Sequence, residues 1–118
     1  MAEAPEKLVG DIYWAEPAHV DDTGVDRAIL RPDGELVIDF AFDGARYTVT
    51  LKAISGNEYR GRYATRYDGK LVDGAVMCRL YRSGSQMLVL GRWEEDNQRY
   101  HWWAELNGTE HFADERPK

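Results

Sequence analysis

The sequence lacks a long apolar stretch, a secretory leader and a pair of cysteines, and each absence excludes a class of protein. No run of apolar residues approaches the roughly 20 that a membrane-spanning helix needs. Glu3 and Glu6 stand where a leader would be basic, and no apolar segment follows them. Cys78 is the single cysteine, so the chain has no internal disulfide. An unpaired thiol without an export signal predicts a protein of the reducing cytoplasm.

Basic residues are also few for a protein that binds polyanions. The 118 residues include 15 Lys and Arg against 21 Asp and Glu, which gives a net charge of -6. Binding to phosphates requires a basic surface, so we expect neither a nucleic-acid partner nor a membrane partner. The length fits a single domain, residues 1–118, and the hydrophobic fraction of 43% is sufficient for a packed core.

Helical periodicity is missing as well, because no segment repeats apolar residues at about every 3.6 positions. Instead, runs of strand length alternate apolar with polar residues, and Asp-Gly and Asn-Gly pairs that favour tight hairpin turns separate them. These runs predict strands at 10–16, 25–31, 35–42, 46–54, 58–67, 71–82, 86–95 and 98–106. We expect residues 17–24 to form either a flap over one end of the sheet or a surface connection without a role, and residues 1–9 and 108–118 to form tails.

A chain of consecutive hairpins predicts an antiparallel up-and-down meander, which leaves two exposed sheet edges. Closing the sheet removes both edges, so the predicted fold is all-β and most simply an eight-stranded barrel, with an open sandwich as the alternative. A barrel of this size either fills with side chains or holds one small ligand.

A Gly-Arg-aromatic pattern recurs in the predicted strands. A strand glycine near an aromatic residue on the same face lets a ring from the neighbouring strand lie over bare backbone. The copies are Gly61-Arg62-Tyr63 and Gly91-Arg92-Trp93, with a looser third in Gly10-x-Ile12-x-Trp14. With this pattern and its strand count, the segment 10–106 resembles the calycin-type barrels, the avidins and lipocalins. That resemblance implies an up-and-down barrel that binds a small molecule.

Charge is unevenly distributed along the chain. Residues 59–93 hold seven positive and two negative side chains, a charge of +5, whereas the rest of the chain holds eight and 19, a charge of -11. In one interpretation the arginines of this segment gather to bind an anion. In the other they lie on the outer face of the barrel and pair with carboxylates of neighbouring strands.

Tryptophan and arginine provide the candidate binding residues. Trp102 and Trp103 are adjacent, so in a strand they point to opposite faces, and we expect Trp103 to point outward. Trp103 would then share a face with Arg99 and His101, which predicts an interface with a protein partner or a second copy. The residues predicted to bind a ligand at one barrel mouth, by ring stacking and charge pairing, are Trp14, Arg62, Tyr63, Arg79, Trp93 and Trp102.

Catalytic and metal-binding patterns are weak, and we expect no cofactor. His19 with Asp21 and Asp22 lacks the spacing of a zinc site, and we interpret these residues as loop polarity. The same interpretation applies to the group Glu110, His111 and Asp114. The leading hypothesis is therefore a non-catalytic barrel that takes a small anionic or aromatic ligand. An inhibitor or immunity-type interaction module is the first alternative, and an enzyme of unknown class is the second.

Overall fold

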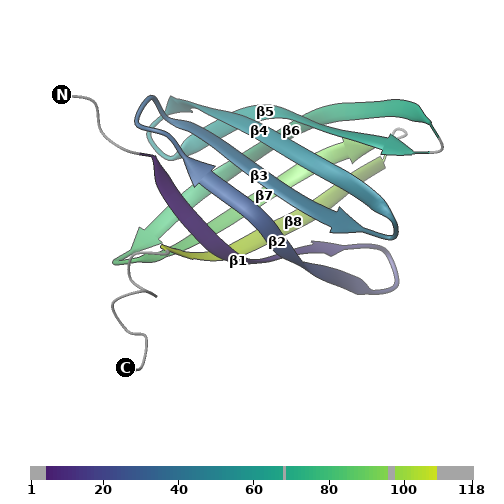
Figure 1. Ribbon diagram of the computed structural model, residues 1–118, viewed down its shortest axis with the longest axis horizontal. Coiled ribbons are helices and arrows are strands. Elements are labelled where there is room, and N and C mark those ends of the chain that lie inside the picture. The colour runs from purple at the N-terminus through teal and green to yellow at the C-terminus, as the bar shows by residue number, and fades with distance from the viewer. Residues whose placement is uncertain (1–4, 68, 96–97, 109–118) are drawn as a thin grey trace.

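The protein is a closed antiparallel β-barrel in which each strand pairs with the next along the chain and β8 pairs with β1 (Figure 1). The computed structural model describes residues 5–67, 69–95 and 98–108, and within these ranges there is no helix and hence none that could span a membrane. The predicted eight-stranded meander is confirmed, and the open sandwich is excluded. The strands are β1 (Glu6–Ala15), β2 (Val20–Leu30), β3 (Glu35–Phe42), β4 (Ala45–Ser55), β5 (Glu58–Tyr67), β6 (Lys70–Ser83), β7 (Gln86–Glu95) and β8 (Gln98–Gly108).

The segment predicted as a flap, 17–24, is instead a tight turn followed by the first residues of β2. Glu16 and His19 exchange two backbone hydrogen bonds of 2.8 and 3.3 Å, which close a two-residue turn. Gly24 lies within β2 and pairs with Asp11 of β1. Asp and Gly are depleted from strands, so local propensity concealed this pairing and the contact with β1 overrides it.

The barrel also includes residues that the sequence assigned to the tails. β1 begins at Glu6, so residues 6–9 are strand, and Gly108 is the last residue of β8. Leu8 pairs with Gly108 across the seam that closes the barrel, which gives these residues a partner that no local pattern reveals. Residues 109–118 lie outside the described residues.

Side chains of alternate residues fill the barrel interior, and their character differs between the two ends. Aliphatic side chains fill the end where β1 begins, including Leu8, Leu36, Leu51, Leu80, Met87 and Leu106. Rings fill the opposite end, including Trp14, Phe40, Tyr63, Trp93 and Trp102. The interior is therefore a packed core, and a ligand could enter only near an opening.

Two inward-facing glycines admit close neighbours. Gly91 pairs with Trp102, and a Cβ atom at Gly91 would lie 2.6 Å from the indole ring and 2.5 Å from the carbonyl oxygen of Met77. The ring thus lies over bare backbone, as the Gly-Arg-aromatic pattern predicted. At Gly61 the neighbour is the backbone of β4, because a Cβ atom there would overlap the carbonyl oxygen of Thr50.

Candidate functional site: an aromatic pocket at one mouth

A pocket of about 170 Å³ opens at the aromatic end of the barrel. Strands β1, β3, β4, β7 and β8 supply its rings, and the turn between β1 and β2 supplies one carboxylate. The pocket is smaller than the roughly 300–1,000 Å³ of sites for drug-sized ligands, so it suits a compact chemical group. The described lining residues are Trp14, Glu16, Phe40, Phe42, Tyr47, Trp93 and Tyr100.

Ring-to-ring contacts hold the aromatic walls of this mouth pocket in place. Phe42 meets Trp14 edge-on, with ring centroids 4.6 Å apart and planes at 89°. Phe40 and Tyr47 stack with centroids 5.0 Å apart and planes 3° apart. Trp14 lies 6.2 Å from Trp93, which joins the wall formed by β1 to the wall formed by β7. Such pairs contribute about 0.5–1.5 kcal/mol each beyond their buried area, so the walls are preformed.

Glu16 is the single charged side chain among the described residues that line the mouth pocket. Its side chain is 33% exposed, and its Oε2 atom accepts a hydrogen bond of 3.3 Å from the indole Nε1 of Trp14. This bond fixes the carboxylate beside the aromatic wall. The sequence did not identify Glu16, because its place at the mouth depends on the tight turn that follows Trp14.

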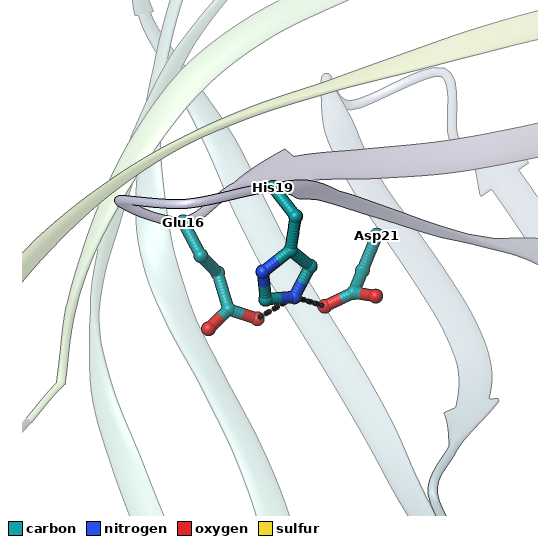
Figure 2. Close-up of side chains that lie close together, drawn as sticks. All are labelled: Glu16, His19 and Asp21. Atoms are coloured by element: carbon teal, nitrogen blue, oxygen red, sulfur yellow. Dashed lines mark hydrogen bonds and ion pairs between the residues drawn. The ribbon is translucent and has the colours of Figure 1, made fainter.

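Glu16 also belongs to a cluster on the rim of the barrel (Figure 2). The Nε2 atom of His19 lies 2.9 Å from Asp21 and 3.7 Å from the Oε2 atom of Glu16. The three ligand atoms lie within 4.8 Å of one another, a set that a divalent transition metal would accept. The third member is Glu16 rather than Asp22, and the bond between His19 and Asp21 accounts for the geometry without an ion.

Two buried indole groups at the aromatic end of the barrel, those of Trp93 and Trp102, have no hydrogen-bond acceptor among the described residues. The Nε1 atoms of Trp93 and Trp102 are buried, and neither donates a hydrogen bond within the described part of the chain. An unsatisfied buried donor costs about 1–3 kcal/mol. Trp93 lines the pocket with its ring, while its Nε1 atom is itself buried.

The structure separates the six residues that the sequence assigned to one ligand site. Trp14, Tyr63, Trp93 and Trp102 are buried inside the barrel, at 6%, 3%, 8% and 1% exposure. Arg62 and Arg79 lie on the outer surface, because they alternate with the inward residues of β5 and β6. The side chain of Arg62 is 64% exposed and lies 3.4 Å from Asp73. The aromatic residues and the arginines therefore occupy opposite faces of the sheet.

The arginines of β5–β8 form a basic outer face with two adjoining hollows. The hollows have volumes of about 320 and 470 Å³ and share Arg60, Met77 and Arg92. Arg60 lies 3.6 Å from Glu58, whereas Arg92 donates to the sulfur of Met77 at 3.2 Å. Arg92 and Arg79 form no ion pair within residues 5–67, 69–95 and 98–108. This placement matches the interpretation in which the arginines line the barrel exterior.

Trp103 points out of the barrel, as predicted, and covers part of an apolar outer patch. It stacks on Tyr13 of β1, with centroids 5.1 Å apart and planes 8° apart. Leu90 pairs with Trp103 from the other side and is 45% exposed. Hereafter the outer patch means Tyr13, Trp103 and Leu90. Arg99 and His101, the other predicted interface residues, are exposed on the same face of β8.

Cys78 is a core residue of the barrel. It is buried in β6, and burial raises the pKa of its thiol to about 12. A thiol with this pKa stays protonated at neutral pH, whereas a nucleophilic cysteine reacts as the thiolate. Cys78 is therefore not an activated nucleophile.

Comparison with known proteins supports the fold and no more. No protein-family model matches the chain, and no curated protein matches it. A solved structure of a mutant of Transferrin Binding Protein B, a vaccine antigen from Haemophilus parasuis Hp5, is similar, with a TM-score of 0.56 and 17% sequence identity. The match covers 92% of this chain and 27% of that chain. The protein thus resembles a barrel that forms about a quarter of a longer protein.

Proposed function

We propose that the protein is a non-catalytic binding barrel that takes a small ligand in its mouth pocket. The observation that carries this proposal is a preformed pocket in which six of the seven described lining residues are aromatic. The packed interior restricts the ligand to the mouth. The volume of about 170 Å³ restricts it to a compact group.

The position of the arginines modifies the hypothesis drawn from the sequence. Arg62 and Arg79 lie outside the barrel, so they do not contribute a positive charge to the mouth. The proposal therefore keeps the aromatic alternative, extends it to compact apolar groups, and omits the anion.

The four tryptophans supply a direct test by NMR. Trp14 and Trp93 line the mouth, whereas Trp103 lies outside the barrel and serves as an internal control. We would add choline, or its uncharged isostere with carbon in place of nitrogen, and follow the indole N–H signals. We expect the signals of Trp14 and Trp93 to move and that of Trp103 to remain. Movement of the Trp103 signal alone, or of none, would refute binding at the mouth.

A second function, self-association through the outer patch, is favoured by the charges around that patch. Asp11 of β1 and Glu105 of β8 are neighbours in the strand register beside the Tyr13–Trp103 stack. Arg79 of β6 and Arg92 of β7 flank Leu90, farther from β1. A two-fold axis through the patch would bring the carboxylates of one copy against the arginines of the other. We propose a second copy of this chain as the partner, with the ring of Trp103 at the centre.

A further inference from the structure

The charge of the mouth pocket selects among compact ligands. Glu16 carries the one charge of the described lining residues, and no Lys, Arg or His accompanies it there. Its carboxylate is two-thirds buried among rings that cannot neutralise it. A positively charged ligand would compensate the charge of this carboxylate, whereas an anion would be repelled by it.

The aromatic walls, like Glu16, favour a positively charged ligand. The face of an aromatic ring carries partial negative charge, so a cation over the ring is attracted to it. Trp is the strongest such ring, and the pocket has two, Trp14 and Trp93, whose ring centroids lie 6.2 Å apart. Several aromatic rings with one carboxylate form the type of cage that holds alkylammonium groups.

His19 on the rim does not neutralise the carboxylate of Glu16. His19 bonds to Asp21 at 2.9 Å and lies farther from Glu16, at 3.7 Å. The bond that Glu16 accepts comes from the neutral indole of Trp14, which adds no charge. The negative charge of Glu16 is therefore available to a group in the pocket.

We infer that the mouth pocket binds a compact organic cation with an alkylated ammonium head, held by the aromatic walls and by Glu16. This inference rests on the proposed function of the mouth. It adds the chemical class of the ligand, which the aromatic walls alone do not determine.

Calorimetric titration with three probes of similar shape tests the charge preference. The probes are choline, its uncharged carbon isostere and dimethylbutanoate, each titrated into the full chain in the presence of EDTA. We expect choline to bind about tenfold more tightly than the isostere, and the carboxylate to bind least. Equal binding of choline and the isostere would overturn the cation inference while the proposed function stands. Binding of none of the three would overturn both.

A matched pair of variants then assigns the effect to Glu16. Glu16→Gln should weaken choline binding by about tenfold and leave the uncharged isostere unchanged. Asp43→Asn removes an equal charge from an exposed turn at the same end of the barrel, at a residue that neither lines the pocket nor belongs to the rim cluster, and should change choline binding by less than about twofold. Equal losses in both variants would overturn the role of Glu16. Thermal unfolding of each variant checks that the fold is retained.

Discussion

Gly91 shows how one missing side chain shapes the barrel interior. A Cβ atom there would contact both the indole of Trp102 and the carbonyl oxygen of Met77, at 2.6 and 2.5 Å. Gly91→Ala should therefore lower the free energy of unfolding by about 2 kcal/mol, the cost of overpacking a core. Denaturant unfolding measures it. Gly24→Ala is the control, because its nearest atom, on Asp11, lies 3.8 Å away and no loss is expected. A similar loss in both variants would contradict this account.

The sequence identified some residues of the mouth pocket and missed others for a physical reason. Trp14 and Trp93 were found because large rings at alternate strand positions face a core. Phe42 and Tyr100 obey the same alternation, but their place at the mouth depends on which strand ends meet around the barrel. Arg62 was assigned to the ligand site although it alternates with Tyr63, and alternation sends it outside.

At the scale of elements, the β1–β2 hairpin is where local preference and structure diverge. Hydrogen exchange should show protection of those Val20–Gly24 amides that bond to β1, because this segment pairs with Asp11–Ala15, whereas the pairing of β2 with β3 begins only at Val25. Amides outside hydrogen-bonded structure exchange without cooperative opening. Exchange measured residue by residue by NMR tests this, with the amide of Ala18 in the turn as the unprotected reference, because Pro17 has no amide hydrogen. Fast exchange throughout Val20–Gly24 would contradict the pairing with β1 and favour the flap expected from the sequence.

The closed barrel was predictable from the sequence at the scale of the whole molecule because consecutive hairpins leave two edges that must be hidden. The seam itself, in which Leu8 meets Gly108, joins the two ends of the chain and has no local signal. Charge behaves similarly. The basic segment 59–93 was visible in the sequence, but its exposure on the outer face follows from which residues the closed sheet turns inward.

Self-association is the property of the whole molecule that the outer patch predicts. Sedimentation equilibrium should show a dimer of the intact chain, and Trp103→Ala should weaken it by at least about tenfold, because aromatic residues at interface centres carry much of the binding energy. The stack of Trp103 on Tyr13 contributes about 1 kcal/mol to folding, so the variant should remain folded.

Charge reversal distinguishes the two-fold arrangement from nonspecific association through the outer patch. Arg79 lies beside Leu90 on β6, and Glu105 follows Trp103 by two residues on β8. In the proposed two-fold arrangement, each faces the other's type of charge in the partner. Arg79→Glu should weaken the dimer, and adding Glu105→Arg should restore it, because the exchanged charges again attract across the axis. Increasing salt should weaken the intact dimer for the same reason. A monomeric intact chain at high concentration, or a double variant no better than Arg79→Glu, would contradict the arrangement, since two-fold symmetry requires both charges to act as a pair.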